Sequence, residues 1–114
     1  MAEFFLTKRA ILDLLEIEKY SIEKWGEGQT DNYMSELYDA FGKIAQNPEI
    51  GILRKNRSFP FCMAPVGKHF AIYKTGENGI VIATILHGRR NIEAIINGLS
   101  HVLAREIDAL DLNG

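Results

Sequence analysis

The sequence predicts an α+β fold in which an N-terminal strand precedes an antiparallel helical hairpin, a three-stranded antiparallel meander and a C-terminal helix. Apolar residues recur at helical spacing in three long segments, which predicts amphipathic helices. Three short runs rich in β-branched and aromatic residues follow one another with hairpin-sized links, which predicts the meander. At 114 residues and 46% hydrophobic composition, the chain is long enough for one core, so we expect a single domain over residues 1–114.

The N-terminal segment is predicted to be a strand that leads directly into a helix. Residues 3–6 are short and apolar, and Thr7 is placed to cap a helix that begins at Lys8 and ends at Trp25. The apolar residues at helical spacing are Ile11, Leu14, Leu15, Ile22 and Trp25. We expect this stripe to face the core more than a partner.

A second amphipathic helix is predicted to begin at Thr30 or Asp31 and to end at Asn47-Pro48. Its apolar residues are Tyr33, Leu37, Ala40, Phe41 and Ile44. The link between the two helices, residues 26–29, is short and rich in glycine, which predicts an antiparallel hairpin. Such a hairpin needs a sheet to cover.

Three strand-like runs, at 58–64, 69–74 and 79–86, predict that sheet, with turns at 65–68 and 75–78. The last run is apolar without interruption from Ile80 to Leu86, which is typical of a central strand covered by helices. The residues just before the first run are expected to form a loop.

Asn91 is a good N-cap for a last helix, which is predicted to run from Ile92 to about Leu110 as a C-terminal extension, 92–110. One face of this helix carries Ile92, Ile95, Ile96, Leu99, Val102, Leu103 and Ile107. His101 lies opposite and is expected to be solvated. The apolar face must be buried on the sheet, against a second copy of the chain in a homo-oligomer, or against another partner.

Composition excludes several classes of function. Thirteen Lys and Arg against fifteen Asp and Glu give a net charge of -2, so the molecule as a whole does not attract nucleic acid. Cys62 is the only cysteine, which excludes an internal disulfide and, with no N-terminal signal pattern, predicts a cytoplasmic protein. No apolar run approaches the ~20 residues that a membrane span needs. Without a phosphate-binding glycine loop, zinc-ligand spacing or nucleophile elbow, no metal and no cofactor are expected.

The remaining chemistry is basic. After the apolar run the chain reaches His87, Arg89 and Arg90, which must meet solvent at the edge of the sheet. Further candidates are Arg54, Lys55 and Arg57 in the loop before the meander, Lys68 in its first turn and Tyr73 in its middle strand. Strand order cannot be derived from one sequence, so the residues leave open whether these groups gather into one site or remain separate surface cations.

Six short segments in register resemble the RelE/ParE superfamily of bacterial type II toxins, in particular its ParE-like branch. The resemblance runs from about Phe5 to Ala94. The segments are Leu6-Thr7-Lys8-Arg9-Ala10, Ile22-Glu23-Lys24-Trp25-Gly26, Asn47-Pro48-Glu49-Ile50-Gly51, Pro65-Val66-Gly67-Lys68-His69, Ile72-Tyr73 and Ile85-Leu86-His87-Gly88-Arg89-Arg90-Asn91.

The resemblance implies a toxin held inactive by a cognate antitoxin, a DNA-binding protein of the ribbon-helix-helix type whose C-terminal segment wraps the toxin. Such pairs also serve in plasmid stabilisation. Helix-in-groove packing and strand addition are reasonable modes of binding. The residues expected to contact the antitoxin are Leu15, Ile22, Trp25, Tyr33 and Leu37.

Two activities occur in this superfamily. ParE-like members trap the complex of DNA gyrase with cleaved DNA, and RelE-like members cut messenger RNA on the ribosome. The resemblance implies target contacts through His87, Arg89, Arg90, Arg54, Arg57 and Lys68. An RNase would use His87, Arg89, Arg57 and Tyr73 as catalytic groups.

Gyrase inhibition by binding is favoured over RNA cleavage, because the chain lacks an aromatic or basic tail after the last strand and its net charge suits ribosome binding poorly. A third reading is a toxin-like fold that has lost activity and serves as a regulatory binding partner. ParE-like chains commonly stop soon after the turn that corresponds to Asn91, so the C-terminal helix is a departure from the family pattern.

Overall fold

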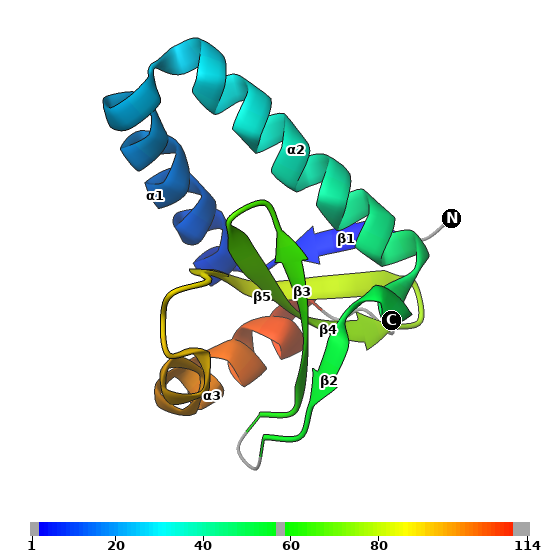
Figure 1. The fold of residues 1–114 in the computed structure, drawn as a ribbon. Helices are drawn as coiled ribbons and strands as arrows, with labels where there is room; N and C mark the ends of the chain where they lie inside the picture. Colours follow the sequence, from blue (N-terminus) through cyan, green and yellow to red (C-terminus); the bar gives the residue numbers. More distant parts are fainter. Residues whose placement is uncertain (1–2, 57–58, 111–114) are drawn as a thin grey trace.

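The computed structural model describes residues 3–56 and 59–110 and has the α+β fold predicted from the sequence (Figure 1). The elements, in chain order, are β1 (Glu3–Leu6), α1 (Lys8–Trp25), α2 (Glu27–Gln46), the short 3-10 helix η1 (Pro48–Ile50), β2 (Ile52–Arg54), β3 (Phe61–Val66), β4 (His69–Gly76), β5 (Gly79–His87) and α3 (Ile92–Leu110). No helix of the described residues is long and apolar enough to cross a membrane.

The strands form one sheet in the order β1-β5-β4-β3-β2. β1 pairs in parallel with β5, from Glu3 opposite Gly79 to Leu6 opposite Ile82, and the other neighbours are antiparallel. The α1–α2 hairpin lies on one face of the sheet and α3 on the other (Figure 1). Because both faces of β5 are covered, its apolar run is buried throughout, as the uninterrupted pattern predicts.

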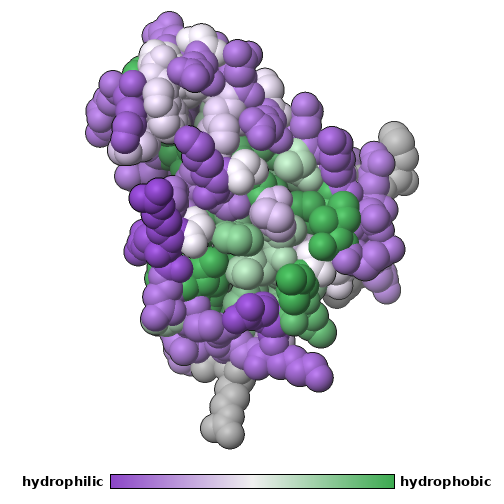
Figure 2. Space-filling model, viewed as in Figure 1, coloured by the Kyte–Doolittle hydropathy of each residue, from purple (hydrophilic) through white to green (hydrophobic). Residues whose placement is uncertain are grey.

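The sheet has one strand more than predicted. β2 is a three-residue edge strand that pairs with β3, in a region where the sequence predicted a loop. Ile52 and Leu53 are 65% and 61% exposed, so the strand lacks the buried alternation by which strands are recognised. Apolar surface gathers in the middle of the molecular face on which β2 and β3 lie in front (Figures 1 and 2).

The predicted bounds of the first meander strand also need correction. Its predicted start, at residue 58, lies outside the described residues, and β3 begins at Phe61. β3 continues through Pro65 and Val66, which were expected to form the turn; the turn is Gly67-Lys68. Pro65 lies beyond the stretch of β3 that pairs with β2, where one side of the strand needs no backbone donor.

A single residue joins the two helices, so the predicted four-residue link is wrong. Gly26 has φ +84°, which reverses the chain in one step, and Gly28 lies inside α2. Thr30 is not an N-cap. Its hydroxyl donates to the Gly26 carbonyl at 2.8 Å, one turn back, and the side chain is buried.

The buried face of α1 differs from the predicted stripe. Thr7 caps the helix as predicted and accepts a hydrogen bond from the Ala10 amide at 3.0 Å. The buried residues of α1 are Ala10, Leu14 and Ser21, with Ile17 packed beside them. Of the predicted stripe, Leu14 alone is buried, and Ile11, Leu15, Ile22 and Trp25 are 40% to 56% exposed. Small residues allow the helix to approach the sheet closely, and the larger apolar groups are left outside.

α3 is buried on the chain's own sheet. Asn91 caps it as predicted, accepting from the Ala94 amide at 3.2 Å. Ile96 and Leu103 pack in a second core cluster on the face opposite the hairpin, with Phe61 and Leu86 of the sheet. Val102 was expected on this face but is 43% exposed, whereas His101 is exposed as predicted.

Candidate functional site

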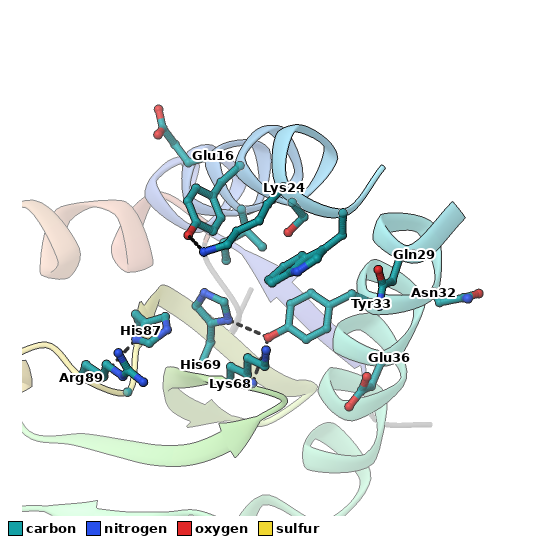
Figure 3. A pocket seen from close by; sticks show the side chains of 15 residues that line it. Glu16, Lys24, Gln29, Asn32, Tyr33, Glu36, Lys68, His69, His87 and Arg89 are labelled. Atoms are coloured by element: carbon teal, nitrogen blue, oxygen red, sulfur yellow. Dashed lines mark hydrogen bonds between the residues drawn. The ribbon is translucent and has the colours of Figure 1, made fainter. Parts of the chain in front are cut away.

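A groove of about 1160 Å³ opens where the helical hairpin faces the ends of β4 and β5 (Figure 3). We call it the hairpin groove. The residues that line it are Glu16, Ile17, Tyr20, Ser21, Lys24 and Trp25 of α1, Gln29, Asn32, Tyr33 and Glu36 of α2, and Lys68, His69, His87, Gly88 and Arg89 of the sheet. The groove therefore combines exposed aromatic rings with cations from both of its walls.

Tyr33 bridges the two walls of the hairpin groove. The Lys68 amide donates to the Tyr33 hydroxyl oxygen at 2.9 Å, and this oxygen lies 2.7 Å from His69 Nδ1 (Figure 3). Because this oxygen already accepts from the Lys68 amide, we assign the Tyr33 hydroxyl as the donor to Nδ1, which places the proton of a neutral His69 on Nε2. Burial raises the pKa of the Tyr33 hydroxyl, which keeps it a donor.

His69 is uncharged at neutral pH. Its pKa is lowered from 6.5 to about 4. Burial is the largest cause of this shift, and the nearby His87 and Lys68 contribute to it. A neutral imidazole with a free Nδ1 lone pair is the form that accepts from Tyr33. The lowered pKa of His69 and its assigned role as acceptor for Tyr33 thus agree on a neutral imidazole.

The turn between β3 and β4 is pressed against the hairpin. Gly67 has φ +60°, and a Cβ atom at this position would lie 2.7 Å from the Tyr33 ring. Glycine is therefore required both for the backbone conformation and for the close approach. The ammonium of Lys68 lies over the Trp25 ring, 4.9 Å from its centroid, and so joins the same turn to the end of α1.

The ends of β4 and β5 are joined through two histidines. His69 and His87 are opposite each other in the strand pairing, and their rings meet edge to face with centroids 5.3 Å apart. His87 Nδ1 accepts from the Arg89 amide at 3.2 Å, and the Gly88 amide donates to the Lys68 carbonyl at 3.3 Å. These contacts define the path of the chain as it leaves β5.

A second hollow, of about 450 Å³, lies on the other side of these histidines, between α1, the end of β5 and the start of α3. We call it the α1–α3 hollow. It is lined by Arg9, Leu12, Asp13, Glu16, Ile17, His69, Ile85, Leu86, His87, Arg90 and Ile95. Arg89 and Arg90 are adjacent in sequence, yet Arg89 lines the hairpin groove and Arg90 the hollow.

Comparison with known proteins identifies the family. The model of the ParE toxin of the type II toxin-antitoxin system, parDE, matches residues 4–92. The chain belongs to this family. Toxin ParE1 of Caulobacter vibrioides is 31% identical over 94 residues, which cover 82% of this chain and 97% of that protein. Toxin ParE1 of Mycobacterium tuberculosis is 29% identical over 93 residues, which cover 81% of this chain and 95% of that protein.

A solved structure supports the fold of this ParE-family toxin. A chain of the chromosomal ParDE TA system from P. aeruginosa superposes with a TM-score of 0.64 at 16% identity, covering 76% of this chain and 96% of that one. The family match ends at residue 92, where α3 begins. α3 therefore lies almost entirely beyond the region that the family model matches.

The structure brings some of the predicted site residues together. Lys68, His87 and Arg89 line the hairpin groove, and Arg90 lies in the adjoining hollow. Arg57 lies outside the described residues. Arg54 lies elsewhere, because its guanidinium pairs with Glu93 of α3 at 3.0 Å, beside Asn56, which also donates to that carboxylate.

Tyr73 does not share a site with His87, contrary to the sequence-based expectation. Its ring is fully buried, and its hydroxyl donates to the Pro48 carbonyl at 2.6 Å and accepts from the Gly51 amide at 3.0 Å. A Cβ atom on Gly51 would overlap this hydroxyl, so Gly51 is fitted to the tyrosine. Tyr73 thus secures η1 and the start of β2 to the sheet.

The residues expected to contact an antitoxin divide into two groups. Leu15, Ile22 and Trp25 are exposed on α1, and Tyr33 is half-buried in the groove. Leu37 is wrong as a surface contact, because its side chain is fully buried between α2 and the sheet. Helical spacing alone does not distinguish the two faces of a helix that is apolar on both.

Sequence reasoning missed His69 and Arg9. His69 begins a predicted strand, and the one sequence signal for it is that a strand pairing with the end of β5 would bring it opposite His87. Arg9 lies in the first turn of α1, pairs with Asp13 one turn on at 3.6 Å, and gains its neighbours in β5 and α3 only through the packing of α1. In the part of the chain that the structure describes, no three His, Cys, Asp or Glu residues are grouped to hold a metal ion.

Proposed function

We propose that this ParE-family toxin inhibits DNA gyrase by binding its complex with cleaved DNA, and that the end of β5 and the turn before β4 provide the contacts. The observation that carries the proposal is the convergence of Lys68, His87 and Arg89 on one groove, with Arg90 beside it. Three cations and a histidine on a half-open surface suit an anionic or mixed protein–DNA target.

The absence of an assembled catalytic set in the described residues supports binding over RNA cleavage. RNA cleavage needs groups that activate the 2′-hydroxyl, stabilise the phosphate and protonate the leaving oxygen around one point. Of the groups nominated for these roles, the Tyr73 hydroxyl is bound to two backbone groups within the core. Among the described residues His87 and Arg89 remain, and they are sufficient for contact with a target, whereas Arg57 lies outside the described residues.

The antitoxin is proposed to bind along α1 and into the hairpin groove. Leu15, Ile22 and Trp25 leave apolar surface uncovered on the outer side of α1, and Tyr33 extends that surface into the groove. An amphipathic segment from the C-terminal part of a ribbon-helix-helix antitoxin would cover such a surface by helix-in-groove packing. The solved relative of the same fold comes from a ParDE TA system, so an antitoxin is the partner proposed here, and the exposed residues of α1 are the argument for where it binds.

The test is a gyrase assay on supercoiled plasmid with the purified toxin, in which trapped complexes are scored as linear DNA after denaturation. The wild-type toxin is expected to yield linear DNA, and the Arg89→Ala/Arg90→Ala variant to yield at least tenfold less, because two cations are removed from the contact surface. Lys8→Ala/Arg105→Ala removes the same charge at exposed positions outside the groove and should retain the wild-type level. Intact plasmid with active gyrase would refute the proposal, and cleavage of ribosome-bound messenger RNA in a parallel reaction would then identify the RNase activity.

A further inference from the structure

We propose that His69 is a positioning residue that holds the His87 side chain, and with it the end of β5, against the α2 wall of the hairpin groove. The inference rests on the proposed function in one respect, namely that His87 and Arg89 contact the target. The orientation of the His87 ring can be measured in the toxin alone, without any target.

The first step of the argument is the anchoring of His69 by α2. The Tyr33 hydroxyl oxygen accepts from the Lys68 amide at 2.9 Å and lies 2.7 Å from His69 Nδ1, the acceptor to which we assign its proton. The glycine at position 67 lets the turn press on the Tyr33 ring, so the tyrosine is held by its ring as well as by its hydroxyl. His69 is therefore fixed at Nδ1 by a residue of a different element, 36 positions away in sequence.

The second step is the contact between the two histidine rings. His69 and His87 form a cross-strand pair at the end of the β4–β5 ladder, and their planes are inclined at 79°. Edge-to-face rings of a directly opposed pair restrict each other's side-chain rotamers. His87 is exposed to solvent, so the contacts that limit its orientation are the anchored His69 ring and the hydrogen bond from the Arg89 amide.

The third step is the continuation from His87 into the basic segment. His87 Nδ1 accepts the Arg89 amide, which ties the backbone of the arginine to the imidazole. Movement of the His87 ring would release that hydrogen bond at the point where the chain turns toward α3. Through these contacts His69 acts on the orientation of Arg89 without lying beside its guanidinium.

The charge state of the groove makes this role specific to an uncharged ring. The titratable groups that line the groove with His69 include Lys24 and Glu16 of α1, Glu36 and Tyr33 of α2, Lys68 of the turn, and His87 and Arg89 of β5 and its end, and Arg9, Asp13 and Arg90 line the adjoining hollow with it. A permanent cation in place of His69 would lose the acceptor for Tyr33 and would repel Lys68 and Arg89. A neutral ring allows these cations to gather around one groove.

Two substitutions separate the two contacts of His69. His69→Asn keeps an acceptor near the position of Nδ1 but removes the ring that touches His87, and His69→Phe keeps a ring but removes the acceptor for Tyr33. Tyr33→Phe removes the hydroxyl from the other side and serves if a His69 variant fails to fold. His101→Asn is the matched control, because His101 is exposed on α3 away from the groove.

The experiment records the ring signals of His87 by NMR in the full-length toxin and, in parallel, the linear DNA trapped by gyrase. Both His69 variants and Tyr33→Phe should displace the His87 ring signals, and His101→Asn should leave them in place. Trapping should fall about tenfold in the His69 variants, as expected for loss of one constraint at a contact surface, the ring contact in His69→Asn and the hydrogen bond in His69→Phe.

The outcomes are distinct. Unchanged His87 signals in folded His69 variants overturn the positioning role, whatever gyrase does. Displaced signals with undiminished trapping also overturn the proposal, because the position of His87 would then have no consequence for the target. If the wild-type toxin itself does not trap gyrase, displaced His87 signals in the variants support the positioning role and refute the proposed function.

Discussion

Asp13 of α1 accepts hydrogen bonds from the Ile85 amide at 3.0 Å and from the Thr84 hydroxyl at 2.5 Å, both through Oδ2. β1 pairs with β5 only as far as Ile82, so the edge of β5 beyond this point has no strand partner. The Thr7 hydroxyl donates to the Ala83 carbonyl at 2.7 Å, and the Asp13 carboxylate accepts from the amide of Ile85, two residues further along β5. A helix side chain thus continues the role of the short strand β1 along the edge of β5.

Asp13→Ala should destabilise the fold by about 2–3 kcal/mol, because it leaves the Ile85 amide and the Thr84 hydroxyl without their acceptor in a largely buried place. The free energy of unfolding from urea denaturation measures the loss. Asp39→Ala removes an exposed carboxylate from α2 and should change stability by less than about 0.5 kcal/mol. Equal effects of the two substitutions would show that Asp13 has no special role at the β5 edge.

The stability of the fold should decrease as pH falls from 6.5 toward 4. The pKa of His69 is lowered to about 4, so in this window the unfolded chain binds a proton that the folded chain does not. The part of the free energy of unfolding that depends on a neutral His69 is fully present above pH 6.5 and is lost as pH falls toward 4. Its size is roughly 2 kcal/mol once solvent screening of this half-buried ring is allowed for.

The matching measurement compares urea denaturation of wild type and His69→Asn at the two ends of that window. The stability advantage of the wild type should shrink at the lower pH, since asparagine does not titrate. His101→Asn should follow the wild-type pH dependence at both ends. A constant difference between wild type and His69→Asn would contradict the low pKa.

Gly67→Ala should lower stability by about 1–3 kcal/mol, because alanine disfavours φ +60° and its Cβ would press on the Tyr33 ring. Gly98→Ala is the matched control in the middle of α3, where nothing lies within 4 Å of a Cβ atom. This change should raise stability by up to about 1 kcal/mol through helix propensity. Thermal unfolding monitored by circular dichroism gives both signs, and stabilisation by Gly67→Ala would exclude the close packing of the turn against Tyr33.

α3 should behave as part of the core although it lies beyond the region matched by the family. Leu103→Ala removes a fully buried side chain from the second core cluster and should cost about 2–5 kcal/mol. Val102→Ala, one residue earlier and 43% exposed, should change stability by less than about 0.5 kcal/mol. Small effects of both changes in urea denaturation would mean that α3 is only loosely attached to the sheet.

Local signals in the sequence indicated the three long helices and every strand except β2. Thr7 and Asn91 cap helices because a side-chain oxygen three residues before an amide is a local arrangement, independent of the rest of the fold. The buried character of β5 was also readable, since only a strand covered on both faces tolerates an uninterrupted apolar run. The same local segments were sufficient to indicate the family.

Tertiary structure decided the face of α1 that is buried and the neighbours of the groove residues. Ala10, Leu14 and Ser21 are the buried residues of α1, a choice that depends on surfaces the helix meets only after folding. The contacts of Tyr33 with His69, and of Tyr73 with Pro48 and Gly51, join residues 22 to 36 positions apart, and strand order and register create them. For the same reason Arg89 lines the hairpin groove and Arg90 lines the α1–α3 hollow. The backbone turn after a strand and the elements on either side set the direction of each side chain, and no local sequence pattern encodes them.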